Sequence, residues 1–267
     1  MEKKLSMQTK WLQAAKDLWD CVNRLPEAVE VHTHPWRRDS IRRLESYRDK
    51  YAGKRCFIIG NGPSLKNTDM AKLKGEFTFG MNRIFLMFPE LGFKTSFLVS
   101  VNDLVIEQSQ KEFKEVNIPM FLSWRSRKWI EPRDNLHYLY TTYTGKKFAK
   151  DATLIPYANL PATFPCLQLA YFMGFSQAIL IGVDHSFTTK GKLNTTIVSA
   201  GDDPNHFHPK YFGKGFKWQL PDLNTSEVGY LLAKENYSRD GREVIDATVG
   251  GKLTIFPKVK FDTLFNE

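Results

Sequence analysis

Apolar and polar residues follow one another along this chain in blocks that predict an alternating α/β fold. Residues 55–59 are apolar without polar alternation and stop at a glycine, a pattern typical of a strand buried on both faces of a parallel sheet. Similar runs predict strands at 77–81, 96–101, 119–123, 178–184 and 244–246. Apolar residues at helical spacing predict helices at 69–73, 104–116, 164–173 and 226–237. We therefore expect one mostly parallel sheet flanked by helices.

The first fifty residues have a purely helical pattern. Leu5, Leu12, Leu18 and Val22 recur at helical spacing, and Pro26 is predicted to end that helix. A second helix is predicted from about residue 40 to 51. We divide the chain into an N-terminal helical extension, residues 1–50, and one α/β domain, residues 51–267. A basic cluster in the extension predicts a solvated face or, as the alternative, contact with a membrane surface; its members are Arg37, Arg38, Arg42 and Arg43.

Three predicted strands end in asparagine, at Asn61, Asn82 and Asn102. Each asparagine alone is typical of a turn. The carboxyl ends of parallel strands share one edge, where such sheets bind ligands, so we expect the three amides to line a shared site. A later strand ends at Asp184, which is predicted either to cap a backbone N–H or to position a ligand group.

The turn after the first predicted strand reads Gly60-Asn61-Gly62-Pro63-Ser64. Glycine permits tight turns and close approach of a ligand, and the free N–H groups of a following helical turn attract anions. The alternative is a plain strand-to-helix connection. Further along, Thr163 is predicted to cap the helix that begins at Phe164.

Two long segments, residues 124–160 and 185–224, have no clear periodicity. The first is expected to form a lid-like loop or an inserted helical pair. The second is too aromatic to be disordered and is expected to be functional. It contains His206 and His208, which together with Asp202 and Asp203 are a candidate metal site. Since no third partner can be identified for two histidines that point to opposite sides of a strand, we expect no metal.

The sequence carries a formal net charge of +9, which favours anionic partners. It contains no nucleic-acid-binding signature, so we expect no nucleic acid. It contains neither a secretory signal nor a run of about 20 apolar residues, and Cys21, Cys56 and Cys166 are far apart, as in reducing compartments. We expect a cytoplasmic protein, peripheral at the inner membrane face in the alternative, and a homo-oligomer remains open.

Several of these segments together resemble known families. The residues that carry the resemblance are Gly60 to Leu65, Asn82, Asn102, Gly182-Val183-Asp184 and Asn205-His206-Phe207. They resemble the bacterial sialyltransferases of glycosyltransferase family 42, and also the wider MptE-like family, named for a 6-hydroxymethylpterin pyrophosphokinase. The resemblance covers about residues 50–250 and implies a Rossmann-like, GT-A-like catalytic domain with a lid.

The sialyltransferase resemblance implies transfer of a CMP-activated sugar to a glycan or lipid-glycan acceptor without a metal or other cofactor. It implies that His206 is the catalytic base, and imidazole exchanges protons near neutral pH. The resemblance implies that Asn61, Asn82, Asn102 and Thr163 line the nucleotide site, and we expect Gly62, Pro63, Ser64 and Asp184 to contact the nucleotide as well.

This sequence departs from the sialyltransferase pattern after Asp184, where His185, Ser186 and Phe187 replace the tyrosines that assist the leaving phosphate. An arginine expected just before Thr163 is replaced by leucine or proline. Sialic acid itself is therefore in doubt. The phosphate or the acceptor is expected to contact other residues instead, among them His185, Ser186, His208, Lys190, Lys192, Lys210 and Lys214.

Two alternatives remain. The MptE-like resemblance implies a pyrophosphokinase that transfers diphosphate from ATP to a hydroxymethylpterin-like alcohol, with Mg²⁺ on carboxylates such as Asp103 and Asp184. The chain has no Gly-x-x-x-x-Gly-Lys-Ser/Thr loop, which disfavours a P-loop kinase. The other alternative is a non-catalytic nucleotide-sugar-binding protein.

Overall fold

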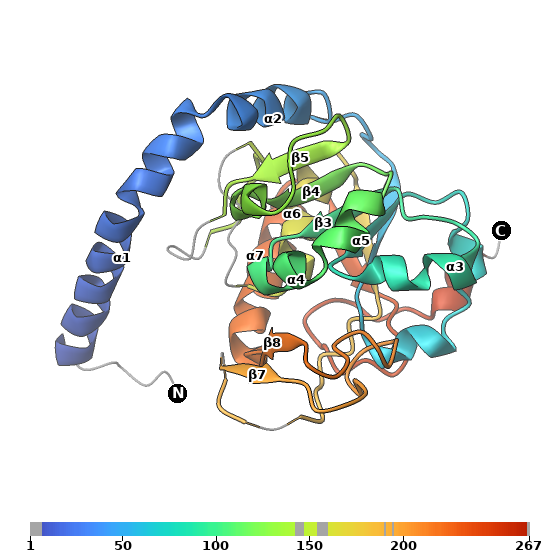
Figure 1. Ribbon diagram of the computed structural model, residues 1–267. Helices are drawn as coiled ribbons and strands as arrows, with labels where there is room; N and C mark the ends of the chain where they lie inside the picture. Colours follow the sequence, from blue (N-terminus) through green and yellow to red (C-terminus); the bar gives the residue numbers. More distant parts are fainter. Residues whose placement is uncertain (1–6, 142–146, 154–159, 190, 194, 266–267) are drawn as a thin grey trace.

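Seven parallel strands form the central sheet of the structure, a computed structural model that describes residues 7–141, 147–153, 160–189, 191–193 and 195–265 (Figure 1). In sheet order the strands are β5 (Leu136–Leu139), β4 (Met120–Ser123), β3 (Phe97–Ser100), β2 (Thr78–Met81), β1 (Arg55–Ile59), β6 (Gln177–Ile181) and β9 (Glu243–Asp246). Each neighbouring pair is parallel. The predicted mostly parallel α/β architecture is confirmed, and the sequence pattern missed only β5 among these strands.

Both faces of the sheet are buried, which explains why its strands show no polar alternation. Along β1, Cys56 and Ile58 face one apolar core, whereas Phe57 and Ile59 face the other. The first core is covered by α2 (Pro35–Glu45), α6 (Thr163–Phe172) and α7 (Leu223–Arg239). The second is covered by α4 (Asp103–Gln108), α5 (Gln110–Glu115) and the 3₁₀ turns η1 (Pro63–Asn67), η2 (Met70–Leu73), η3 (Ile84–Met87) and η5 (Phe261–Phe265).

Several elements differ from their predicted form. The helix predicted at 104–116 is interrupted at Ser109, which ends α4 and precedes α5. The short helices α3 (Phe88–Leu91) and η4 (Trp124–Lys128) were not predicted. The segment predicted as a long loop contains an antiparallel hairpin of β7 (Thr196–Val198) and β8 (Lys217–Gln219). Three-residue strands are too short for periodicity to reveal them.

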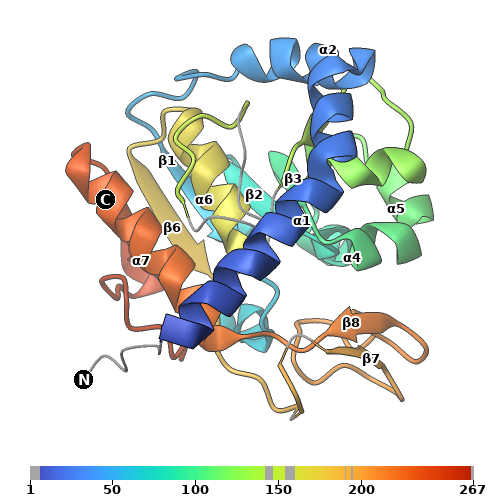
Figure 2. The same cartoon turned by 90° about the vertical axis from the view of Figure 1, so that its left-hand side faces the viewer.

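The N-terminal helix α1 (Met7–Thr33) continues through Pro26, so the prediction that this proline ends the helix is wrong. The chain turns instead at His34, whose side chain accepts a hydrogen bond from the backbone N–H of Trp36 and caps α2. In Figures 1 and 2, α1 is a long helix that leaves the rest of the molecule near α2. Among the described residues, no helix is both long and apolar enough to cross a membrane.

The arginine cluster of α2 is largely engaged with protein groups. Arg37 is buried, and its guanidinium donates to the carbonyl oxygen of Thr153. Arg42 and Arg43 both pair with Asp39, and Arg43 also donates to two backbone carbonyls before β5. Arg37 and Arg43 therefore fix α2 to neighbouring segments, whereas Arg38 and Arg42 are exposed, so the predicted solvated basic face is present only in part.

Candidate functional site

The largest concentration of the predicted site residues lies at the carboxyl ends of β1 and β6. Strands β2 to β5 extend the sheet to one side of β1, and β6 and β9 extend it to the other. The strand order therefore reverses between β1 and β6, and open α/β sheets bind ligands in the crevice at such a switch point. A pocket of about 950 Å³, its open mouth included, occupies this crevice.

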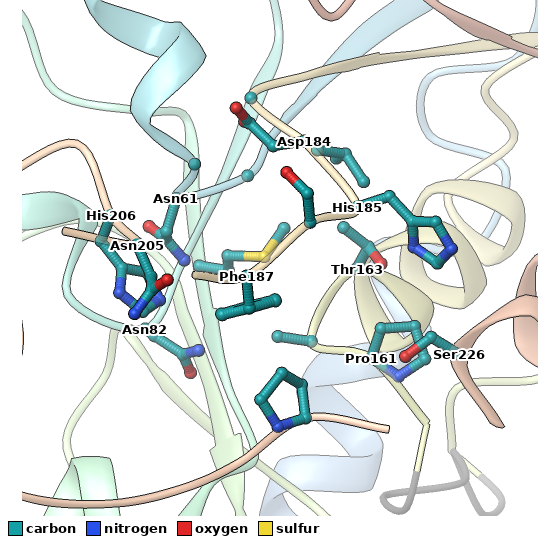
Figure 3. Close-up of a pocket in the computed structure, with 18 of the residues that line it drawn as sticks. Asn61, Asn82, Pro161, Thr163, Asp184, His185, Phe187, Asn205, His206 and Ser226 are labelled. Carbon is teal, nitrogen blue, oxygen red and sulfur yellow. The ribbon is translucent and has the colours of Figure 1, made fainter. Parts of the chain in front are cut away.

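The three asparagines that follow β1, β2 and β3 all line this pocket, and Figure 3 shows two of them, Asn61 and Asn82. Asn82 has a left-handed backbone (φ 50°), and its Oδ1 accepts from the Ser100 hydroxyl at 2.9 Å. Asn102 caps α4, because its Oδ1 accepts from the N–H of Val105. Asn61 Oδ1 is buried and has no hydrogen-bond partner. The side-chain oxygens of Asn82 and Asn102 thus accept structural hydrogen bonds, whereas that of Asn61 is an unused acceptor at the pocket.

The connections after β1 and β6 interlock through glycine. A Cβ on Gly60 would lie 2.2 Å from the carbonyl oxygen of Gly182, and one on Gly62 would lie 1.7 Å from an oxygen of Asp184. Gly182 itself has a left-handed backbone, with φ 65°. Gly60 is therefore required by backbone contact with Gly182, whereas Gly62 leaves room for the Asp184 side chain and Gly182 for the Leu65 side chain. We had predicted that Gly60 and Gly62 serve a tight turn and the approach of a ligand.

Asp184 caps the turn that follows Gly62. One of its carboxylate oxygens accepts from the Ser64 hydroxyl at 2.6 Å and the other from the Ser64 N–H at 3.2 Å. The next N–H, that of Leu65, donates to the carbonyl of Gly62. These backbone donors are therefore already used, and the prediction that they hold a phosphate is wrong. Pro63 and Ser64 do not line the pocket, whereas Gly62 and Asp184 do.

Thr163 lines the pocket, but it is the first residue of α6 and not its cap. Its hydroxyl lies 2.9 Å from the hydroxyl of Tyr230 on α7, and both side chains are buried. Burial raises the pKa of the Tyr230 phenol, so this group stays neutral and able to donate. The predicted helix start was correct to one residue, but the capping role was wrong.

His206 lies on the opposite wall of the pocket and forms a pair with Asp203. Its Nδ1 is 2.6 Å from Asp203 Oδ2, and Asp203 is 7% exposed. The same carboxylate accepts the backbone N–H groups of Asn205 and Phe212. An ionised carboxylate can only accept, so Nδ1 is the donor of this pair, and in the neutral ring Nε2 then keeps a lone pair. This is the arrangement that a histidine base needs.

Aromatic rings fix the plane of the His206 imidazole. It stacks on Tyr211, with ring centroids 4.1 Å apart and planes 11° apart, and meets the edge of Phe212. The loop that carries these residues is tied down from β2, because the buried guanidinium of Arg83 donates to the carbonyls of Lys210 and Tyr211. The His206 ring therefore packs among aromatic side chains, as predicted, and at the same time lines the pocket.

A second histidine, His185, lines the wall formed after β6. Its backbone is left-handed (φ 53°), and its Nε2 is 3.0 Å from a carboxylate oxygen of Glu227 on α7. Ser186 and Phe187 continue the same wall. Figure 3 shows His185 and His206 on opposite sides of the pocket. Asn205 connects the two walls, because its Oδ1 accepts from the N–H and hydroxyl of Thr188.

The described lysines predicted to contact phosphate do not line the pocket. Lys192, Lys210 and Lys214 are exposed, and His208 accepts from the N–H of Lys210 outside it. Lys190 lies outside the described residues. Among the lining residues that the structure describes, none is a lysine or an arginine. The predicted role of His208 and Lys210 at the pocket is therefore not supported by their position.

Sequence reasoning missed several residues of this site. Asp203 was considered only as a metal ligand, although its position three residues before His206 is a usable signal for a pair. Trp218 and Tyr230 come from β8 and α7, elements whose approach to the pocket no local pattern reveals. Trp218 is buried at the pocket with its Nε1 unpartnered, so it supplies a spare donor where Asn61 supplies a spare acceptor.

Metal ligands are sparse in the described part of the chain. No group of three or more His, Cys, Asp or Glu side chains is placed there to hold a metal ion. Of the two carboxylates proposed for Mg²⁺, Asp103 accepts from Ser123 and does not line the pocket. Asp184 lines it and could hold Mg²⁺ only together with substrate oxygens. The residues therefore fit a substrate-bound Mg²⁺ at Asp184 better than a resident metal.

Comparisons with known proteins agree with this architecture. A family model described as 6-hydroxymethylpterin diphosphokinase MptE-like matches residues 34–190. These residues include the three asparagines and Asp184 but end before Asp203 and His206. No curated protein matches the sequence.

The MAf glycosyltransferase from Magnetospirillum magneticum AMB-1 is similar in structure, with a TM-score of 0.51 and 12% sequence identity. The alignment covers 84% of this chain and 38% of that glycosyltransferase. This chain therefore spans well under half of its structural neighbour, and at this identity the likeness shows a shared fold.

Proposed function

The chain belongs to the MptE-like family, and from that premise we propose that it is a transferase that moves a group from a nucleotide donor onto an alcohol acceptor, with His206 as the general base. The observation that carries the proposal is the Asp203–His206 pair at the pocket, which presents a basic nitrogen beside a rim of amides. Both transferase reactions that the resemblance implies need such a base, because each begins with an acceptor hydroxyl.

The proposed chemistry is glycosyl transfer from a CMP-linked sugar to a glycan or lipid-glycan acceptor. Nε2 of His206 takes the hydroxyl proton while the acceptor oxygen forms a bond to the anomeric carbon. The bond between that carbon and the phosphate oxygen breaks, and its electron pair leaves with CMP. Asp203 stabilises the imidazolium that forms, as a buried carboxylate does in a catalytic triad. A base placed in this way contributes about 10²- to 10⁴-fold to the rate.

The lack of cationic lysine and arginine side chains in the described lining of the pocket supports a donor with a single phosphate. No described lining residue is a lysine or an arginine, whereas a triphosphate needs several cations or Mg²⁺ beside it. A single leaving phosphate can be met by a neutral donor such as the Tyr230 hydroxyl, which accepts from Thr163, and by His185, which Glu227 holds in place. The fold shared with a glycosyltransferase supports the same choice.

The second candidate is transfer of diphosphate from ATP to a hydroxymethylpterin-like alcohol, favoured by the description of the family. There the acceptor oxygen would attack the β-phosphorus and AMP would leave. Mg²⁺ would neutralise the phosphates, with Asp184 as its protein ligand. A non-catalytic nucleotide-sugar-binding protein is the third candidate, and it predicts binding without turnover.

Calorimetric titration with CMP, and with ATP in the presence and absence of Mg²⁺, tests the choice of donor. We expect CMP to bind without a metal. Binding of ATP that depends on Mg²⁺, with no binding of CMP, would establish the diphosphokinase instead. Turnover is then measured for wild type, for His206→Asn and for the control His208→Asn, which alters a half-buried histidine outside the pocket.

We expect His206→Asn to lower kcat by about 10²- to 10⁴-fold and to leave nucleotide binding unchanged. The His208→Asn control should keep wild-type turnover. Full activity of His206→Asn would show that His206 is not the base. If wild type binds nucleotide but turns over no donor and acceptor tested, the result would support a non-catalytic binding protein.

A further inference from the structure

The exposed part of α1 carries a regular apolar stripe that no contact in the structure explains. The stripe consists of Trp11, Ala15, Leu18, Val22, Leu25 and Val29, and every one of these side chains is exposed. Trp11, Leu18 and Val29 are 73%, 67% and 60% exposed. Soluble proteins rarely leave such a row of large apolar side chains in water unless it is an interaction surface.

Among the side chains of α1 that the structure describes, those attached to the rest of the molecule lie in its last turns. Glu27 pairs with Arg125 at 3.0 Å, Glu30 pairs with Arg127, and Val31 is buried. The stripe ends at Val29, within this attached part. Figure 1 shows the rest of α1 standing away from the sheet. A helix without tertiary packing is only marginally stable in water, so the free part of α1 needs a partner to remain folded.

The spacing of the stripe identifies the partner. Successive members are 4, 3, 4, 3 and 4 residues apart, the heptad pattern of a coiled-coil seam. In this register Ala15, Val22 and Val29 occupy the a positions, and Trp11, Leu18 and Leu25 the d positions. Valine at a with leucine at d favours two strands. We propose that α1 forms a two-stranded coiled coil with α1 of a second copy of this chain.

The charges of α1 argue against an anionic membrane as the partner. Membrane-surface helices are rich in lysine and arginine on their polar face. The α1 sequence instead mixes the two signs, with Lys10, Lys16 and Arg24 against Asp17, Asp20, Glu27 and Glu30. Two such helices can lie together without net repulsion. The dimer rests on this helix alone and is independent of the proposed reaction.

Sedimentation velocity of the full-length chain tests the dimer between about 1 and 100 µM, the range expected of a short seam. The wild type should approach twice its 30.9 kDa monomer mass as its concentration rises. In Leu18→Glu/Val22→Glu the seam would have to bury carboxylates, so the dissociation constant should rise about a hundredfold or more. The control Asn23→Glu places one glutamate on an exposed residue beside the stripe, and it should dimerise like wild type.

Hydrogen exchange of the wild type provides a second measurement that needs no variant. The amides of residues 11–25 should become more protected as the protein concentration rises. A wild type that stays monomeric throughout the range, or a double variant that dimerises as well as wild type, would overturn the proposal. Binding of the monomer to phosphatidylglycerol vesicles through α1 would overturn it as well.

Discussion

The carboxylate of Asp203 decides which nitrogen of His206 can accept a proton. It holds Nδ1 at 2.6 Å and also accepts two backbone N–H groups. An amide at this position can hold the ring in the wrong tautomer, so we expect Asp203→Asn to lower kcat about a hundredfold or more while the KM of the donor stays within about twofold. The exposed neighbour Asp202 offers the control, since Asp202→Asn should change neither constant. A rise in KM with unchanged kcat would contradict this role.

A buried histidine on β5 makes the stability of the protein sensitive to acid. Burial, and secondarily the charge of Arg43, lowers the pKa of His137 to about 4 from an ordinary value of 6.5. Between these values only the unfolded chain takes up the proton, so the folded state loses stability as the pH falls from 6.5 towards 4.

Replacing His137 by phenylalanine removes this titration and keeps a ring stacked near Phe121. Between pH 7 and pH 5 we expect wild type to lose about 2 kcal/mol more free energy of unfolding than His137→Phe. Urea denaturation at the two pH values measures the difference. Equal losses in the two proteins would show that His137 is protonated in the folded state.

At the residue level, the sequence predicted correctly the position of side chains that directly follow a strand. Asn61, Asn82 and Asn102 could be assigned to one edge because strand direction fixes where a strand ends. Pro63 and Ser64 were misplaced because their fate depends on Asp184, which lies 120 residues away from Ser64 in the chain. Tertiary hydrogen bonds of this kind leave no local pattern.

At the level of elements, the interlock between the ends of β1 and β6 restricts substitution most severely. In Gly60→Ala the new Cβ would lie 2.2 Å from the backbone oxygen of Gly182, which cannot rotate away. We expect this change to lower the free energy of unfolding by about 2 to 4 kcal/mol, because two strands must separate to admit it. Chemical denaturation measures the loss.

A matched control for this change is Gly201→Ala, since a Cβ there would meet nothing within 4 Å. That variant should stay within about 0.5 kcal/mol of wild type. Comparable stability of the two alanine variants would mean that the two strand ends can move apart without cost.

Long central elements could be predicted and short peripheral ones could not. The strands β1 and β6 have apolar runs bounded by glycine, which identify them without ambiguity. The edge strand β5 reads Leu-His-Tyr-Leu, and its polar residues hid it within an irregular segment. Pro26 was taken as a helix end, but α1 passes through it, because a proline restricts a helix without always stopping it.

For the molecule as a whole, the boundary between extension and body is best tested by truncation. We predicted a division at residue 50, yet Arg37 and Leu44 of α2 are buried, and the family match begins at residue 34. Deleting residues 1–25 retains Glu27 and Glu30 with their arginine partners.

We expect the truncated protein to melt within about 2 °C of wild type, because the deleted part of α1 adds little to the core. Scanning calorimetry measures this, and CMP titration should give the wild-type affinity. A fall of more than about 5 °C would show that the free part of α1 supports the sheet in a way that these contacts do not reveal.

The glycine interlock has a consequence for how this pocket could change its substrate. Its floor lies where Gly60 meets the backbone of Gly182 and Gly62 meets the Asp184 side chain, so it has no room for a new side chain. Its roof, by contrast, comes from residues 185–189 and 203–219, which are joined to each other through Thr188 and Asn205 and to the floor through the hydrogen bond from the Phe207 N–H to the Asn61 carbonyl. Relatives that use different acceptors should therefore differ in the roof and share the floor, so exchanging residues 203–219 between them is the direct route to altered specificity.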